Sequence, residues 1–329
     1  SSGIMGLATL VLVTTFLATF QSGAEGEGLS YDFYAKSCPP LEDIVRATLQ
    51  NIFLTDPTTP AALLRLMFHD CQVQGCDASI LLDQGSGNLA PEMASSRNSA
   101  IQKREAINAI KTMTETACPG QVSCADIVIL AAREAVSMSG GPLIRVPLGR
   151  RDSKISNYRL ADASLPHPNT GVNDMLNIFA KKGMTIEETV AILGAHTLGV
   201  THCFNVLDRL NRMQGGAGSS GDIDGGFLLF LRLTCPPMSL ISNTSFVAND
   251  PSMFTFDNQY YAMAMGGRGV LRIDAEMASD PRTARIMSHF SMNQDAFFRA
   301  FSSAFVKLST SGVLTRNQGV IRRTCNLLD

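Results

Sequence analysis

Apolar residues recur every three or four positions through most of the chain after residue 28, which is the spacing of α-helices with one buried face. Thr59 and Pro60 supply a cap and a first-turn proline ahead of one such apolar segment. They therefore predict a helix over residues 61–71.

Two later segments carry equally clear helical signals. Thr185 and Glu188 have the spacing of a capping box, so they predict the start of a helix over residues 186–196. Residues 124–138 are apolar on nearly all sides and end before Gly140, as expected of a helix in the middle of the protein.

Strand patterns are few. Only residues 79–82 and 145–148 have the composition of short strands, so the sequence predicts a mainly α protein. A Gly-rich stretch contains the spacing GxGxxG at residues 216–221, but it follows no predicted strand. We interpret it as a surface loop rather than a dinucleotide site.

The first residues differ from the rest of the chain. An uncharged apolar run over residues 4–20 precedes Ser22, Gly23 and Ala24, a small-x-small pattern that a signal peptidase could cut. We predict a signal segment over residues 1–28, which is removed, and one domain over residues 29–329. No second stretch of about 20 apolar residues follows, so no membrane contact is expected after removal of the signal.

Charge and cysteine content narrow the class of protein. The chain has 27 Lys and Arg against 29 Asp and Glu, which argues against nucleic acid as a partner. Eight scattered cysteines suit four disulfides, and Asn243 begins a glycosylation sequon. We expect a secreted monomer in the extracellular space or cell wall.

The candidate chemistry begins with two residues four positions apart. Arg65 and His69 share one face of the predicted helix over residues 61–71, whose other positions are largely apolar. A cation and an imidazole in apolar surroundings are costly unless a polar group meets them. His196, at the end of another predicted helix, is a second candidate, although alone it would more often be a packed core residue.

Four motifs carry a close resemblance to class III plant peroxidases. They are Arg65-Leu66-Met67-Phe68-His69-Asp70-Cys71, Gly194-Ala195-His196-Thr197-Leu198-Gly199, Val122-Ser123-Cys124-Ala125-Asp126-Ile127 and Val146-Pro147-Leu148-Gly149-Arg150-Arg151-Asp152. The similarity runs from about Tyr31 to Cys325. It implies the plant haem-peroxidase fold, with about ten or more helices in two halves and one haem b between them.

The implied activity is the reduction of hydrogen peroxide through a ferryl haem intermediate, with one-electron oxidation of small phenolic donors. By the resemblance, His69 is the general base and Arg65 stabilises the charge that develops as the O–O bond breaks. Asn98 would orient His69, although residues 103–105 depart from the family pattern nearby. Phe68 would form a wall of the haem pocket, and Met67 is assigned to packing only.

On the opposite side of the haem, the resemblance makes His196 the iron ligand and Asp274 the acceptor of its other ring N–H. Pro166 matches the substrate-contacting turn, with its carbonyl directed at phenol hydroxyls. Four nearby polar residues would line the donor site, and they predict weak retention of small apolar phenols. These residues are His167, Asn169, Thr201 and Asn205.

The resemblance also implies two Ca²⁺ sites built from hard oxygen ligands. The distal set would be Asp70, Val73, Gly75, Asp77, Ser79 and Glu92, with Val73 and Gly75 contributing backbone oxygens. The proximal set would be Thr197, Asn249, Ser252, Thr255 and Asp257. Asn249 stands where the family usually has aspartate, and neighbouring Asp250 is the alternative after a small shift in register.

The cysteine spacing alone leaves many pairings open. The resemblance implies Cys38–Cys118, Cys71–Cys76, Cys124–Cys325 and Cys203–Cys235. It also implies a buried, structural ion pair between Asp126 and Arg150.

The same residues leave two alternative functions. One is a haem- and calcium-containing protein that binds cell-wall polysaccharide, with incidental turnover. The other is a metal-dependent hydrolase that uses His69, Asp70 and His196, which would need closely set ligands around an open site.

Overall fold

The computed structural model describes residues 28–212, 223–236 and 245–328, and within them the protein is mainly helical. The α-helices are α1 (Leu41–Thr55), α2 (Thr59–Gln72), α3 (Arg104–Ala117), α4 (Cys124–Met138), α5 (Tyr158–Ser164), α6 (Val172–Ala180), α7 (Ile186–Leu193), α8 (Cys203–Arg212), α9 (Gly225–Thr234), α11 (Gln259–Met263), α12 (Arg272–Ser279), α13 (Pro281–Met292) and α14 (Gln294–Ser309). Short 3-10 segments are η1 (Ser79–Leu81), η2 (Glu92–Ala94), η3 (Ser96–Asn98) and η4 (Gly194–Thr197), and η5 (Ala264–Arg268) is a π-helix.

The predicted helices are present, with small differences at their ends. Helix α2 begins at Thr59, two residues earlier than predicted, and Pro60 lies in its first turn. The capping box of Thr185 and Glu188 starts α7 as expected. Helix α7 ends at Leu193, and the chain tightens into the 3-10 segment η4 before His196 is reached.

The strand predictions are wrong. Residues 79–81 form η1, and of residues 145–148 only Leu148 pairs, in an isolated bridge with Ser30. The strands that do form are β1 (Val200–His202) and β2 (Phe246–Ala248), which pair antiparallel with Thr201 opposite Val247. Their partners lie more than 40 residues apart, so local pattern could not reveal them.

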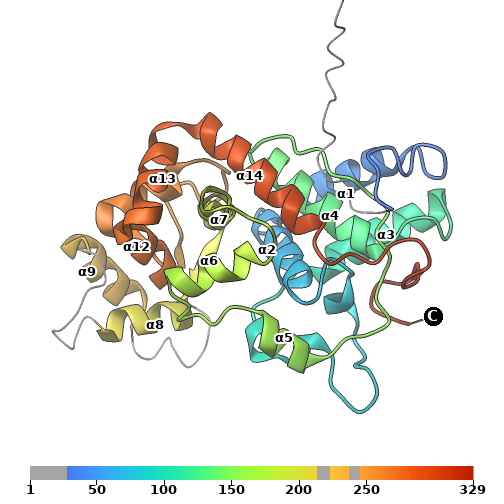
Figure 1. Ribbon diagram of the computed structural model, residues 1–329, viewed down its shortest axis with the longest axis horizontal. Helices are drawn as coiled ribbons and strands as arrows, with labels where there is room; N and C mark the ends of the chain where they lie inside the picture. The colour runs from blue at the N-terminus through green and yellow to red at the C-terminus, as the bar shows by residue number, and fades with distance from the viewer. Residues whose placement is uncertain (1–27, 213–222, 237–244, 329) are drawn as a thin grey trace, which may run out of the picture.

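The core is centred on α4, in which every residue from Cys124 to Val136 is buried. Helix α14 adds a row of fully buried rings, Phe297, Phe301 and Phe305. In the view of Figure 1, α1, α3 and α4 lie on one side of the molecule, and α8, α9, α12 and α13 lie on the other. Helix α2, which carries His69, and helix α7, which leads into the segment with His196, lie between these two sides in the same view.

Long-range links tie the chain together. The disulfides are Cys38–Cys118, Cys71–Cys76, Cys124–Cys325 and Cys203–Cys235, the pairing that the family resemblance implied. Arg150 Nη1 lies 2.8 Å from Asp126 Oδ1, and both side chains are fully buried. Residues 1–27 of the predicted signal segment, the GxGxxG spacing and Asn243 lie outside the described residues.

Candidate active site

A buried chain of hydrogen bonds starts on α2. His69 Nδ1 lies 2.8 Å from Asn98 Oδ1, and the Asn98 amide donates to the Glu92 carbonyl at 2.8 Å. On the other side of the ring, Arg65 Nε donates to His69 Nε2 at 3.3 Å. The four-residue spacing on α2 thus places Arg65 beside His69, and the η2–η3 segment brings Asn98 to the imidazole.

These contacts define which ring nitrogen carries the proton. Because the Asn98 amide nitrogen donates to a carbonyl, its oxygen is the group that faces His69 and must accept. His69 therefore carries its hydrogen on Nδ1 and keeps a lone pair on Nε2. Burial, and after it the charge of Arg65, lower the pKa of His69 to about 3, although the bond to Asn98 opposes the shift. The imidazole is neutral at physiological pH and available as a base.

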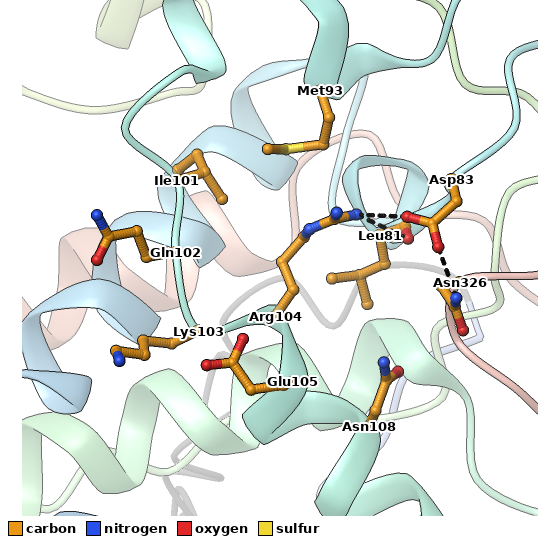
Figure 2. Close-up of a pocket in the computed structure, with 10 residues that line it drawn as sticks. All are labelled: Leu81, Asp83, Met93, Ile101, Gln102, Lys103, Arg104, Glu105, Asn108 and Asn326. Carbon is orange, nitrogen blue, oxygen red and sulfur yellow. Dashed lines mark hydrogen bonds and ion pairs between the residues drawn. The ribbon is translucent and has the colours of Figure 1, made fainter. Parts of the chain in front are cut away.

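The departure from the family pattern at residues 103–105 leaves Asn98 in contact with His69. These residues begin α3 and line a surface cavity of about 370 Å³, together with Leu81, Asp83, Met93, Ile101, Gln102, Asn108 and Asn326 (Figure 2). Lys103 Nζ lies 2.6 Å from Asp56 Oδ2, and Arg104 donates to Asp83 Oδ1 at 3.2 Å. The unusual side chains thus interact away from the imidazole.

A second histidine lies on η4. His196 Nδ1 is 2.9 Å from Asp274 Oδ1, and its side chain is 30% exposed although Asp274 is buried. The same carboxylate oxygen accepts the Tyr260 hydroxyl at 2.7 Å, and burial and the charge of Asp274 raise the pKa of that hydroxyl well above its ordinary value. Sequence reasoning missed Tyr260, because nothing in its local pattern points to a partner on another helix.

The two groups fit a haem. Within the described residues no carboxylate pairs with Arg65, so its partly buried charge favours an anionic or polar ligand. His196 Nδ1 is hydrogen-bonded to Asp274. Among the described residues, no group forms a hydrogen bond with His196 Nε2, which leaves this nitrogen for a ligand. In peroxidases a histidine binds the haem iron through one ring nitrogen. A ligating histidine of this kind donates its other ring N–H to a carboxylate, as His196 does here.

Three buried carboxyl groups gather beside His69. Asp70, Asp77 and Glu92 are buried, and Glu92 Oε2 has no hydrogen-bond partner. Burial raises the pKa of Asp77 to about 6 and of Glu92 to about 8, and it raises that of Asp70, where Asp77 and Glu92 add repulsion.

The loop between these carboxyl groups is tightly packed. Ser79 N–H donates to Asp77 Oδ1 at 3.0 Å, and the Val73 carbonyl accepts from Gly75 at 2.9 Å. Gly75 has φ +155°, and a Cβ there would overlap the Gly312 carbonyl, so only glycine fits.

A second oxygen-rich group follows His196. Thr197 Oγ1 donates to Asp250 Oδ2 at 2.7 Å, and Ser252 Oγ lies 3.1 Å from both Asp250 Oδ1 and Asp257 Oδ1. Thr255 joins the same loop, since its N–H donates to the Ser252 carbonyl at 2.7 Å.

Asn249 does not join this group. Its Oδ1 accepts from Thr201 Oγ1 at 2.6 Å, and its amide donates to the Leu198 carbonyl at 3.3 Å. The structure therefore brings Asp250, and not Asn249, to Thr197 and Asp257, because the pairing of β1 with β2 turns Asn249 toward Thr201.

Phe68 links the α2 histidine to the predicted donor turn. Its ring packs edge-on to His69 with centroids 5.6 Å apart, and it contacts a small cluster that includes buried Leu165. The Leu165 carbonyl accepts a hydrogen bond from the Arg97 guanidinium, so the residue next to Asn98 holds the turn that contains Pro166.

Thr201 is buried and bonded to Asn249, so of the four predicted lining residues it is the one whose side chain is closed to a donor molecule. Met67 is packed in the core, as predicted.

The hydrolase alternative has no support from the geometry. In the part of the chain that the structure describes, His69, Asp70 and His196 do not form a group that could hold one metal ion. A hydrolytic site would require such closely set ligands.

Comparison with known proteins agrees with the geometry. The family model described as Peroxidase matches residues 45–293. Peroxidase 29 of Arabidopsis thaliana is 53% identical over 313 residues, which cover 94% of this chain and 91% of that protein. Peroxidase 57 and Peroxidase 28 of the same plant are each 41% identical, over 90% of this chain and 91% and 92% of their own lengths. The wall-binding alternative is not favoured by these matches. The chain belongs to the peroxidase family and is a haem peroxidase with the plant peroxidase fold.

Proposed function

We propose that Arg65, His69 and Asn98 form the machinery that activates hydrogen peroxide. His69 Nε2 takes a proton from one peroxide oxygen and returns it to the departing oxygen as water forms. Arg65 stabilises the negative charge on the departing oxygen, and Asn98 keeps the Nδ1 proton of His69 in place. Bound haem supplies the iron at which peroxide is reduced. The observation that carries this proposal is the Asn98–His69–Arg65 chain of hydrogen bonds, which is buried at its Asn98 end.

His196 is the residue that would hold the haem iron through Nε2, and Phe68 would contact the haem from the His69 side. Asp274 would orient the His196 ring and raise the basicity of its free nitrogen. This assignment is supported by the 2.9 Å contact between His196 Nδ1 and Asp274 Oδ1.

The electron donors are proposed to be small phenols that meet the carbonyl of Pro166. Arg97 supports the turn by its hydrogen bond to Leu165. His167, Asn169 and Asn205 make the surroundings polar, so unsubstituted phenols should be held weakly. Affinities across a phenol series test this, and tight binding of apolar donors would contradict it.

Two Ca²⁺ ions are proposed to complete the site. On the His69 side, the buried carboxyl groups of Asp70, Asp77 and Glu92 would supply the charged ligands of one ion. Backbone oxygens of Val73 and Gly75 and the Ser79 hydroxyl would complete its shell. On the His196 side, Thr197, Asp250, Ser252 and Asp257 would bind the second ion with the carbonyl of Thr255.

A secreted location is proposed for the mature domain. The four disulfides suit an oxidising compartment, and residues 1–28 would be the removed signal, leaving residues 29–329 as one domain. Among the described helices none combines the length and apolar character needed to cross a membrane. We propose a monomer in the extracellular space or cell wall, where it would meet wall polysaccharide.

The central test compares the holoprotein with His69→Leu and His196→Ala, using His289→Ala as the control for loss of a histidine elsewhere, on α13. His69→Leu should keep the Soret band but react with one equivalent of peroxide slower by orders of magnitude. His196→Ala should lose haem on gel filtration. Normal peroxide reactivity of His69→Leu would reject the proposed base, and normal haem content in His196→Ala would reject the proposed ligand.

A further inference from the structure

The carboxylate of Asp274 serves two rings through one oxygen. His196 Nδ1 and the Tyr260 hydroxyl lie 2.9 Å and 2.7 Å from Oδ1, while Oδ2 accepts the Leu271 N–H at 3.2 Å. An ionised carboxylate only accepts hydrogen bonds. The tyrosine must therefore donate to the same oxygen that the imidazole N–H uses.

We propose that Tyr260 is a positioning residue that limits how strongly Asp274 draws the Nδ1 proton of His196. A carboxylate that accepts from a ligating imidazole raises the basicity of the imidazole's other nitrogen. A second donor on the same oxygen takes up part of the negative charge, so Asp274 becomes a weaker acceptor for His196. Tyr260 would thereby set the electron density that His196 offers to iron. The inference rests on the proposed role of His196 as the iron ligand.

The three side chains come from separate elements, so their meeting is a feature of the folded protein. His196 lies on η4, Tyr260 on α11 and Asp274 on α12. The Tyr260 ring is buried and stands edge-on to the His196 ring, with centroids 5.9 Å apart and planes at 81°. Tyr260 therefore supports the imidazole both by direct ring contact and through the shared carboxylate.

The neighbouring tyrosine provides a matched control. Tyr261 is also buried, and its ring centroid lies 4.9 Å from that of Tyr260. Its hydroxyl donates to the Val190 carbonyl at 2.9 Å and not to Asp274. Replacing either tyrosine by phenylalanine removes one buried hydroxyl from neighbouring positions, and only Tyr260→Phe removes a hydrogen bond to Asp274.

The test uses the holoenzyme with Tyr260→Phe and Tyr261→Phe, and it measures the ferric–ferrous midpoint potential and the iron–histidine stretching band. Tyr260→Phe should shift the potential to more negative values, by up to about tenfold in the oxidised-to-reduced ratio, or about 59 mV for one electron. The stretching band should move to higher frequency. Tyr261→Phe should change neither quantity. Unchanged values in Tyr260→Phe, or equal shifts in both variants, would overturn the proposal.

Two further variants separate this inference from the proposed function. If the stretching band survives in His196→Ala, His196 is not the ligand and the proposed function fails. If the band is lost in His196→Ala but unmoved in Tyr260→Phe, only the role of Tyr260 fails. In an Asp274→Asn background the effect of Tyr260→Phe should vanish, and a persisting shift would show that Tyr260 does not act through Asp274.

Discussion

Replacing Asn98 by alanine isolates what the orientation of His69 contributes to the reaction with peroxide. Asn98 is completely buried and bonded on both sides, to the His69 ring and to the Glu92 carbonyl. In Asn98→Ala the Nδ1 hydrogen of His69 loses its acceptor, so only the contact of Arg65 with Nε2 still favours the reactive tautomer. A buried polar group left without its partner costs about 1–3 kcal/mol.

If that cost falls on the reactive arrangement of the imidazole, the second-order rate constant for peroxide should fall by a factor of about 5 to 150. Stopped-flow absorbance of the haem band under excess peroxide measures this rate constant directly. Asn108→Ala is the control, because Asn108 lines the surface cavity at α3 (Figure 2) and is not among the hydrogen-bond partners of Asn98 and His69. A rate constant equal to that of the unmodified enzyme, with haem content intact, would refute the proposed role of Asn98.

Four further predictions concern protons and cations. Since the pKa of His69 is about 3, the rate of reaction with peroxide should stay level from pH 7 to about 4 and fall through about pH 3. In a stopped-flow pH series, Arg65→Leu should move this fall to higher pH, because the charge of Arg65 lowers the pKa of His69. A fall at the same pH in the variant would contradict the proposed pairing of Arg65 with His69. The unfolded chain takes up the His69 proton below about 6.5, so the free energy of unfolding should also decrease from there to about pH 3. Calcium chelation should lower the melting temperature more at pH 8 than at pH 5.5, because the raised pKa of Glu92, about 8, makes its charged form costly without a cation. In calorimetry, Glu92→Gln should reduce this difference between the two pH values. Equal decreases in melting temperature at both pH values would count against the calcium site at Glu92. Calcium content by atomic emission should drop from two ions to one in Asp250→Asn and stay at two in Asn249→Ala, whereas the reverse order would restore Asn249 as the ligand.

Local chemistry along the chain was enough to predict much of the helical framework. The capping box at Thr185, the proline in the first turn of α2 and the apolar residues 124–138 act over one or two turns, so their effect can be read without knowing the fold. The pairing of Arg65 with His69 is equally local, because a spacing of four on a helix places two side chains together. The resemblance to a known family then supplied the distant partners Asn98 and Asp274.

Other features depend on segments that meet only in the folded protein. The strands β1 and β2 are each three residues long, too short for an alternating pattern, and they exist because they pair with each other. Their pairing turns Asn249 toward Thr201 and leaves Asp250 facing Thr197, a choice between two adjacent residues that spacing left open. Tyr260 reaches Asp274 from another helix. Composition and periodicity report how one segment buries its own face, whereas tertiary packing decides which polar atoms of distant segments share a hydrogen bond.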